Sequence, residues 1–331
     1  MADPATLYPM LVADIGGSNA RFGIAAGRTD GPEGFEIVHQ KTLQVASHTT
    51  FEGALAAFLA EAPVKPISCC VAAAGPTIGR TLQMSNAPWF LDADAIAARF
   101  GWQEVEVIND FVAMARACQF LGADDHDVLI KGKADPSKPR LILGPGTGFG
   151  CAALVPVPGR APIVVSGESG HINLATVTRE ERQITNEIAG MVERVHVESV
   201  ISGPGLARLH SARCLLAGNP AVVDHPKYVT APAAEGDKDC LKSVEIFLGL
   251  FGSVVGDLAM VFGAKGGVYI GGGVMPRLDK LVPNSPFKER MLDKGFMRKY
   301  LDGIPVTMMD SMHLALRGAA DHIESVVAAK D

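Results

Sequence analysis

The sequence predicts an α/β protein built as two similar lobes. Extended and helical patterns alternate along most of the 331 residues, which is typical of the α/β class. One plan, in which a strand, a glycine-rich turn and two further strands follow one another, begins near Leu11 and again near Arg140. The chain also exceeds the roughly 250–300 residues at which a single hydrophobic core usually stops growing. We therefore expect two lobes, with a cleft between them as the default binding site.

The first half of the chain begins with three predicted strands, over residues 11–13, 21–25 and 35–43. The turn DIGGSN joins the first two as a hairpin. The segment FEGALAAFLAEA has helical apolar spacing, and PISCCVAAAGP is predicted as a buried strand that Gly-Pro ends. EVEVIND then alternates like a strand, and FVAMARACQFL is predicted as a helix.

The second half repeats this beginning, with strands over residues 140–143, 151–155 and 163–166 around the turn GPGTGFG. A helix is predicted from Thr178, where Thr178 and Glu181 form a capping box. A long helix follows from about residue 234 to 262, and GVYI and IPVTMM are predicted strands before a final helix from about His313. The stretches KGKADPSKPR and GNPAVVDHPKYVTAPAAEGDKD are predicted surface loops.

Charge and cysteine usage exclude several classes of protein. The formal net charge of -6 argues against binding of nucleic acid or an anionic membrane surface. The six cysteines contain no C-x-x-C pair, and several lie in apolar strings such as ISCCVAAA, which favours buried thiols over a metal or redox cluster.

The sequence also predicts a cytoplasmic protein. MADPATLYPM has neither a basic start nor a long apolar stretch. No later segment is expected to reach the ~18 apolar residues of a membrane span.

Two glycine-rich turns are candidate phosphate-binding loops. In Asp14-Ile-Gly-Gly-Ser-Asn19, backbone N–H groups beside two glycines can meet a phosphate while Asp14 holds a hydrated Mg²⁺. The alternative is an ordinary hairpin turn. The segment from Gly144 to Gly150 has four alternating glycines, which is more than a simple turn requires, at the matching place in the second copy. Together the two loops predict one phosphate clamp from each lobe.

A third glycine cluster, Gly271-Gly-Gly273, follows the strand GVYI. Its bare backbone can accommodate an adenine or ribose, or it can form a tight turn into the next helix. Neither phosphate loop has the pattern G-x-G-x-x-G, and G-x-x-x-x-G-K-[ST] is absent from the chain. The sequence therefore argues against a dinucleotide fold or a P-loop.

Candidate groups for sugar chemistry follow a strand and two bends. Asn109 and Asp110 lie at the carboxyl end of a predicted strand, where open α/β sheets place ligand-binding groups. Asp110 can act as the base that orients and deprotonates a hydroxyl attacking a γ-phosphoryl group, with Asn109 bonding a neighbouring hydroxyl. Alternatively, either side chain caps the helix that begins at Phe111.

The segment GESGH and the residue before SVISGPGL supply further hydrogen-bonding groups. Glu168 and His171 lie in a glycine-flanked bend, and Glu198 precedes the breaker-rich SGPGL. Carboxylates and imidazoles suit vicinal hydroxyls as hydrogen-bond partners. Taken singly, each is more often a solvated surface group or a structural histidine.

An ordered set of motifs resembles the bacterial glucokinase family, from about residue 11 to 280, with a weaker match in the carboxyl-terminal helix. The motifs are DIGGSNARF, MSNAPW, INDF, GPGTGFG, GESGH, ESVISGPGL and GGVYIGGGVMPR. The resemblance implies a two-lobed actin-like ATPase (ribonuclease H-like) fold with duplicated βββαβαβα cores. It also implies a small lobe over residues 1–110 and 312–331 and a large lobe over residues 111–311.

The resemblance further implies phosphorylation of glucose by ATP with Mg²⁺, in a protein that is commonly a homodimer. It makes Asp110 the catalytic base. The residues it implies for glucose are Asn86, Asn109, Glu168, His171 and Glu198, with Asn86 near the sugar cleft. The residues it implies for the nucleotide phosphates are Gly16, Gly17, Ser18, Asn19, Thr147 and Gly148. Asp14 for the metal, and Gly271 and Gly272 for the adenosine, remain candidates from the glycine-rich segments themselves.

Three positions depart from the family pattern. Ser18 replaces the usual Thr and keeps the hydroxyl, Pro145 removes one backbone donor from the second loop, and Ser169 replaces a Gly in the sugar bend. Three rival functions remain open: a kinase for another hexose, a non-catalytic sugar-responsive regulator, and an acyl-phosphate kinase. The acidic candidate groups do not suit the carboxylate substrate of an acyl-phosphate kinase.

Overall fold

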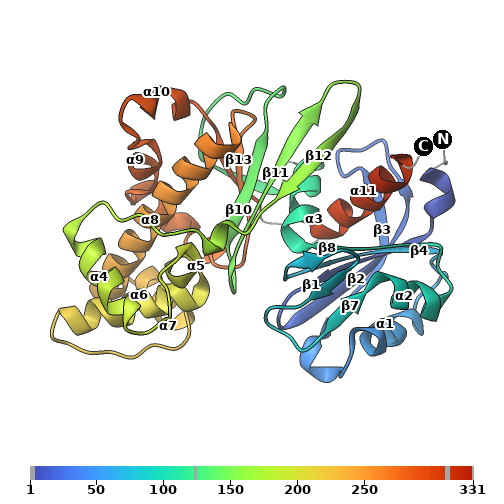
Figure 1. The fold of residues 1–331 in the computed structure, drawn as a ribbon, viewed down its shortest axis with the longest axis horizontal. Helices are drawn as coiled ribbons and strands as arrows, with labels where there is room; N and C mark the ends of the chain where they lie inside the picture. The colour runs from blue at the N-terminus through green and yellow to red at the C-terminus, as the bar shows by residue number, and fades with distance from the viewer. Residues whose placement is uncertain (1–3, 123–124, 310–313, 330–331) are drawn as a thin grey trace. The chain divides into compact units, whose positions relative to one another are not determined.

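Two large sheets repeat one order of five strands, and the second sheet adds a sixth strand, β9 (Figure 1). The computed structural model describes residues 4–122, 125–309 and 314–329. The first sheet has the order β3-β2-β1-β4-β8, and the second has the order β12-β11-β10-β13-β14-β9. In both, the first strand of the copy pairs antiparallel with the second and parallel with the fourth. This repetition confirms the predicted α/β duplication.

The first compact unit comprises Met1–His126, Gly159–Val164 and Ser311–Asp331. Its strands are β1 (Met10–Ile15), β2 (Asn19–Arg28), β3 (Phe35–Gln44), β4 (Ser68–Ala73), β5 (Thr77–Ile78), β6 (Thr81–Gln83), β7 (Phe90–Asp92) and β8 (Glu104–Asn109). Its α-helices are α1 (Phe51–Leu59), α2 (Ala93–Phe100), α3 (Asp110–Ala117) and α11 (Leu314–Ala328), and η1 (Pro4–Leu7) and η2 (Val45–Ser47) are 3-10 helices. Strands β5, β6 and β7 form a separate small sheet.

The second compact unit comprises Asp127–Pro158 and Val165–Asp310. The strands of the six-stranded sheet are β9 (His126–Ile130), β10 (Arg140–Pro145), β11 (Phe149–Val157), β12 (Arg160–Ser166), β13 (Val268–Ile270) and β14 (Val306–Met309). The α-helices are α4 (Arg179–Ala189), α5 (Val197–Val200), α6 (Gly203–Leu216), α7 (Lys227–Ala234), α8 (Lys238–Phe262), α9 (Phe287–Leu292) and α10 (Arg298–Leu301). The 3-10 helices are η3 (Ser169–His171), η4 (Met275–Arg277), η5 (Asp279–Asn284) and η6 (Gly295–Met297).

Alternation along β1 explains why the sheet of the first unit is covered on both faces. Leu11, Ala13 and Ile15 belong to one buried cluster, whereas Met10 and Val12 belong to another. Successive side chains of a strand point to opposite faces, so each face needs its own apolar partner. Helices α1 and α2 lie on one side of the sheet, and α3 and α11 lie on the other (Figure 1).

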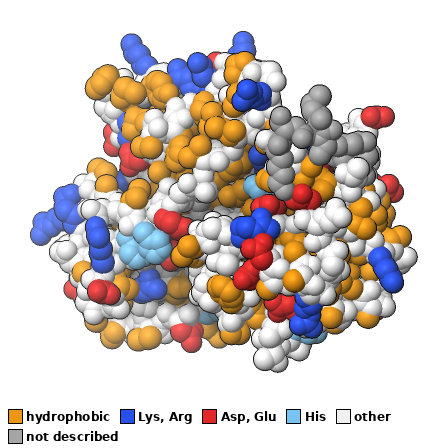
Figure 2. Space-filling model, turned by 45° about the vertical axis from the view of Figure 1, so that its right-hand side comes forward, with side chains coloured by type: hydrophobic (Ala, Val, Ile, Leu, Met, Phe, Trp, Pro, Cys, Tyr) orange, Lys and Arg blue, Asp and Glu red, His pale blue; other side chains and the backbone are white. Residues whose placement is uncertain are grey.

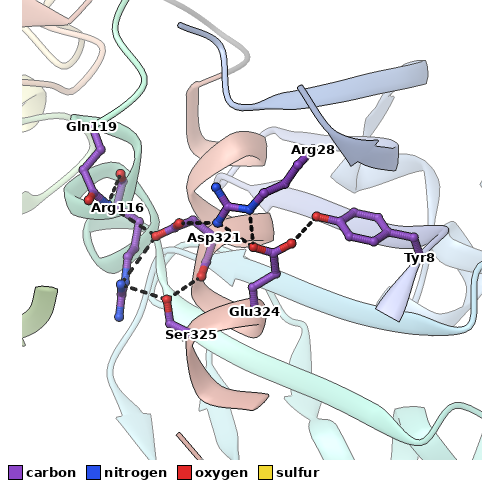
Figure 3. Close-up of polar contacts among 7 residues, drawn as sticks. All are labelled: Tyr8, Arg28, Arg116, Gln119, Asp321, Glu324 and Ser325. Carbon is purple, nitrogen blue, oxygen red and sulfur yellow. Dashed lines mark hydrogen bonds and ion pairs between the residues drawn. The ribbon is translucent and has the colours of Figure 1, made fainter. Parts of the chain in front are cut away.

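A polar network ties α11 to β2, α3 and the amino-terminal segment (Figure 3). Arg28 bonds Glu324 at 2.6 Å and Asp321 at 3.2 Å, and the Tyr8 hydroxyl also donates to Glu324. Arg116 of α3 reaches the other oxygen of Asp321 at 3.4 Å. Burial raises the pKa of Tyr8 and of Asp321, so these groups depend on their partners inside the unit. The network therefore fixes α11 beside α3.

The predicted boundary after residue 110 differs from the compact units. The first unit extends to His126 because α3 packs against α11, and Ala113 of α3 shares a buried cluster with Leu316 of α11. The hairpin tip Gly159–Val164 also groups with this unit. The predicted start of the last helix at His313, and residue 312 of the predicted small lobe, lie outside the described residues.

One loop prediction in the second unit is wrong, and a segment singled out for its helix-breaking residues also forms the start of a helix. The stretch GNPAVVDHPKYVTAPAAEGDKD contains helix α7, whose Val229 and Thr230 are buried, and the helix expected from about residue 234 begins only at Lys238. The breaker-rich SGPGL begins α6. There the Ser202 side chain accepts from the Gly205 amide, and Pro204 lies in the first turn, where a helix needs no donor from it.

Helix α8 contradicts the expectation that no segment of the chain reaches the apolar length of a membrane span. In the part of the chain that the structure describes, it is the one helix long and apolar enough to cross a membrane by length and composition. Most of that apolar stretch is buried inside the second unit, where Phe247, Leu250 and Phe251 join its main cluster. Such burial is typical of a helix in a protein core. All six cysteines are buried and lie outside any disulfide, and the sequence predicts this burial for several of them.

We expect Glu181→Gln to remove a stabilising contact that depends on pH. The predicted capping box of α4 is present, and Arg290 pairs with the buried Glu181 carboxylate. Burial opposes the charged form, but the bonds from Arg290 and the Thr178 and Val177 amides outweigh it and hold the pKa of Glu181 below its usual value of 4.5. The variant should therefore lose about 1–3 kcal/mol of unfolding free energy at pH 7.

The pH dependence has a definite sign because the folded pKa is lowered. The contribution of Glu181 is present above pH 4.5 and is lost as the pH falls through the folded-state pKa. Urea unfolding at a series of pH values should show wild type and variant converging in acid. Glu180→Gln, which changes an exposed neighbour paired with Lys242, should cost at most about 1 kcal/mol. A gap between wild type and Glu181→Gln that stays constant in acid would contradict this account.

Candidate active site

In the first unit, the glycine turn and Asp110 lie at the same edge of the sheet. Strands β1, β4 and β8 run parallel, with Ile15 opposite Ala73 and Ala73 opposite Asn109. The chain therefore leaves β1 for the turn and β8 for Asp110 at one end. Neighbouring strands are ~4.8 Å apart, so β1 and β8 are about 10 Å apart. The structure confirms the prediction that Asn109 and Asp110 lie at the carboxyl end of a strand.

Asp14 is held by a residue that sequence reasoning did not select. The hairpin register places Arg21 of β2 opposite Asp14, and Arg21 Nη1 lies 2.8 Å from Asp14 Oδ2. Burial raises the pKa of the Asp14 carboxyl, and the Arg21 guanidinium opposes that shift. The pair places a carboxyl and a guanidinium next to the glycine turn, and the hairpin register of β1 and β2 brings them together.

The first glycine turn closes through its own backbone. The Gly16 amide donates to the Asn19 carbonyl at 2.9 Å, so this amide is already engaged in the turn. The Asn19 side chain accepts from Gln44 at 2.8 Å. At Gly17, an added Cβ would come within 3.0 Å of the Asn86 Cβ. The structure therefore brings Asn86, from MSNAPW, to the turn that also carries Ser18.

Asn109 caps helix α3, as one of the two sequence alternatives proposed. Its Oδ1 accepts from the Phe111 amide at 2.9 Å, and its Nδ2 donates to the Gly75 carbonyl at 3.1 Å. The Asp110 carboxylate, at the first helical position, also accepts from the Phe111 amide at 3.0 Å. These bonds fix both side chains at the end of β8. A contact from Asn109 to a sugar hydroxyl remains a prediction.

In the second unit, the glycine loop lies at the amino terminus of α6. The Gly203 amide donates to the Gly146 carbonyl, and the Gly146 amide donates to the Gly148 carbonyl, both at 2.8 Å. A helix amino terminus presents orphan N–H groups and a positive dipole end, which favour a phosphate. The amino terminus of α6 thus lies beside the loop, although the sequence analysis did not predict a helix at SGPGL.

The third glycine cluster packs directly on that loop. The Gly271 amide donates to the Leu143 carbonyl at 3.0 Å, as expected for neighbouring strands β10 and β13. Gly272 has φ +87°, and a Cβ there would lie 2.8 Å from the Pro145 carbonyl carbon. Only glycine suits such a backbone. The two predicted nucleotide-binding segments of this unit therefore lie side by side.

Glu198 contacts the second glycine loop through its side chain. Its Oε2 accepts from the Phe149 amide at 2.8 Å. A Cβ at Gly148 would lie 3.1 Å from the Glu198 carboxyl carbon, and one at Gly170 would lie 3.3 Å from its Oε2. The Glu198 carboxylate thus lies between the loop and the GESGH bend, in close contact with both.

The GESGH bend presents its two predicted sugar ligands outward. Glu168 and His171 are exposed, while Ser169 between them is buried and its hydroxyl bonds the Cys151 thiol. The His171 ring packs against that of His196, with centroids 4.8 Å apart. His196 was not selected from the sequence, because a lone histidine carries no pattern.

A cavity of about 750 Å³ opens in this part of the second unit. Its lining includes Thr147 of the glycine loop, Glu198, His196, Ser202 at the start of α6, and Arg208. Predicted phosphate and sugar ligands thus share one hollow with polar groups of both charges. On the face drawn in Figure 2, basic, acidic and apolar side chains are interspersed.

The repeated sheet order, the glycine turns that follow the first strand of each copy, and the strand-end Asp110 define an ATP-dependent phosphotransferase of the actin-like ATPase fold. The family model described as Glucokinase matches residues 11–326. The chain belongs to the glucokinase family, which confirms the resemblance seen in its motifs.

Relatives of this family match over nearly their whole length. The glucokinase of Saccharophagus degradans is 36% identical over 324 residues, which cover 97% of this chain and 99% of that protein. The glucokinase of Cupriavidus pinatubonensis is 36% identical over 321 residues, covering 95% and 92%.

Solved structures agree with the fold. A crystal structure of glucokinase from an Antarctic psychrotroph has a TM-score of 0.85 at 35% identity, covering 95% of this chain and 98% of that one. The ROK family glucokinase from Streptomyces griseus, solved with glucose and AMPPNP, has a TM-score of 0.65 at 20% identity, covering 95% and 98%. This second likeness bears on the fold alone.

Proposed function

We propose that this protein transfers the γ-phosphoryl group of ATP to the 6-hydroxyl of glucose, giving glucose 6-phosphate and ADP for glycolysis. Membership of the glucokinase family supports the reaction. The observation that carries the chemistry is the position of Asp110 at the same sheet edge as the first glycine turn. A base and a phosphate-binding turn are thereby held by one rigid element.

Asp110 would act as the base in this reaction. Its carboxylate orients the attacking hydroxyl and takes its proton late, as the loose transition state of phosphoryl transfer requires. Asn109, fixed by its bonds to Phe111 and Gly75, would bond a neighbouring hydroxyl. Asn86, beside Gly17, would contribute a further polar group near the sugar.

The nucleotide would be held by backbone groups and hydroxyls of both glycine loops. Gly16, Gly17, Ser18 and Asn19 would hold phosphate in the first unit, and Thr147 and Gly148 would do so in the second. Gly271 and Gly272, packed on the second loop, would accept the adenosine. Pro145 has no backbone N–H to donate to a phosphate. The amino terminus of α6, which lies beside Gly146, would supply N–H donors to the phosphate in its place.

Asp14 suits a magnesium ion that arrives with the nucleotide. Among the described residues there is no group of three or more His, Cys, Asp and Glu side chains fit to hold a metal. Mg²⁺ usually keeps several waters and is held by one or two carboxylates together with substrate phosphates, which a single Asp14 can satisfy. When bound, the ion would neutralise phosphate charge, and Arg21 would keep the Asp14 carboxylate in place.

We expect Glu168→Gln to weaken glucose binding with little effect on folding. The side chain is exposed, so its loss leaves no buried group unpaired. Removing a charge-assisted bond to a hydroxyl costs about 1–3 kcal/mol, which should raise KM for glucose. Glu245→Gln, an exposed glutamate of α8, is the matched control. An unchanged KM in the Glu168 variant would remove this residue from the sugar site.

A sugar panel tests the function itself. ADP release would be followed with glucose, fructose, mannose, N-acetylated hexosamines and acetate, using Mg-ATP and polyphosphate as alternative donors. We expect the highest kcat/KM with glucose and ATP. Preference for another hexose would assign a different sugar kinase, and turnover of acetate would assign an acyl-phosphate kinase. Absence of turnover with every acceptor would indicate a regulator.

Two further properties complete the proposal. We infer a homodimer, as the resemblance implies, and a cytoplasmic enzyme, as the composition of the chain predicts. Light scattering of the purified full chain should give twice the mass of 34.8 kDa. A monomer at micromolar concentration would contradict the dimer and leave the proposed reaction intact.

A further inference from the structure

Two short segments of the second unit carry all three sugar ligands proposed for it. Glu168 and His171 lie in the bend, and Glu198 lies at the start of α5. Asn173 and His196 form a β-bridge between these segments, and the Val197 amide donates to the Ile172 carbonyl at 3.0 Å. The two segments are therefore joined backbone to backbone, and His196 lies at the junction.

The His196 side chain adds a second connection. Its Nδ1 lies 3.0 Å from the Gly170 carbonyl oxygen. A carbonyl oxygen only accepts, so the hydrogen of this bond is on Nδ1. Gly170 separates Ser169 from His171, and the His171 ring rests against the His196 ring at 52°. One imidazole thus contacts both the backbone and a side chain of the bend.

The Gly170 peptide has little room to move without disturbing the site. An added Cβ there would lie 2.8 Å from the Phe149 carbonyl oxygen and 3.3 Å from Glu198 Oε2. The Phe149 amide in turn donates to the same Glu198 oxygen at 2.8 Å. A shift of Gly170 would therefore displace Glu168 and His171 and would disturb the contacts of Glu198.

We propose that His196 is a positioning residue for the sugar: its Nδ1–H holds the Gly170 carbonyl so that Glu168, His171 and Glu198 keep their mutual geometry. The inference rests on the proposed glucose phosphorylation. It assigns His196 no contact with glucose and no proton transfer. Its loss should weaken glucose binding more than ATP binding, because the bond holds the bend directly and reaches the second glycine loop only through Glu198.

The test compares His196→Asn with His196→Leu in the full-length chain. These side chains have similar size, but only the Asn carboxamide can donate to the Gly170 carbonyl. We expect His196→Leu to raise KM for glucose about 3–10-fold, the loss of one neutral hydrogen bond, with a smaller rise in KM for ATP. His196→Asn should recover most of the glucose affinity. Calorimetric titration with glucose alone should show the same order.

His225→Ala is the matched control, since this exposed histidine lies in the same unit and its ring nitrogen accepts a hydrogen bond from the nearby Lys227 amide at 3.1 Å. Wild-type glucose affinity in His196→Leu would overturn the inference, as would equal losses in the Asn and Leu variants. A rise in KM for ATP as large as that for glucose would show a general structural role instead. If the wild type itself turns over no glucose, the proposed function fails, which the sugar panel detects separately.

Discussion

Asp110→Asn should lower kcat by about 10²–10⁴-fold, the range attributed to a positioned general base, while the protein remains folded. Asn keeps the size of the side chain and its oxygen can still accept from the Phe111 amide, so α3 keeps its first turn. The ability to accept the sugar proton is lost. Steady-state kinetics with glucose and ATP, beside thermal unfolding of the same samples, would measure both effects.

Asp94→Asn is the matched control for that experiment. Asp94 is also an acidic residue in the first turn of a helix of the first unit, and it pairs with Arg80 at the surface. We expect its kcat to equal that of the wild type. Near-normal turnover in Asp110→Asn would remove Asp110 from the mechanism. A large drop of kcat in both variants would show that the loss of an acidic residue from the first turn of a helix, and not the loss of a base, lowers kcat.

Gly318→Ala should destabilise the first unit by about 3 kcal/mol or more, at the upper end of overpacking effects. A Cβ at this buried position of α11 would collide with the carbonyl oxygen of Ala113, 2.7 Å from its carbonyl carbon and 3.0 Å from the Ala117 amide nitrogen. The obstacle is backbone of α3, so no side chain can rotate aside. Helix α3 must move, and it begins at Asp110. We therefore expect lower kcat as well as a lower denaturation midpoint.

In contrast to Gly318→Ala, we expect Gly53→Ala to stabilise the first unit. Gly53 lies in α1, where a Cβ would come only to 3.4 Å of the Thr50 hydroxyl, an ordinary contact. Alanine is favoured over glycine in a helix interior by about 0.5–1 kcal/mol, and by less in the first turn, where Gly53 lies, so this variant should be slightly more stable than the wild type. Urea unfolding of both variants separates close packing from helix propensity. Equal shifts would contradict the account given for Gly318.

Much of the fold was predictable because its signals are short in sequence. The capping box of Thr178 and Glu181 involves residues three apart, and the strand ending at Asn109 is marked by alternation over six residues. The errors arose where local and tertiary preferences disagree. Proline and glycine made SGPGL look like a break, yet Pro204 occupies the one turn of a helix that tolerates it.

Helix α7 was missed for a related reason. Pro226 precedes it and Pro232 lies within it, so the local pattern is that of a loop. The helix forms because Val229 and Ala233 are buried in the core of the second unit. Burial of apolar surface, which no window of sequence reports, outweighs the local cost of proline.

The sequence by itself determined the α/β class, the duplicated plan, the glycine turns and the strand-end Asp110, because each depends on residues within a few positions of one another. The tertiary structure alone decided which of these groups meet. Glu198 reaches the Phe149 amide across 49 residues, and His196 reaches the Gly170 carbonyl across 26. Such bonds form only after the chain has packed, because closing those loops costs entropy. The burial of the whole core offsets this cost, and one hydrogen bond does not.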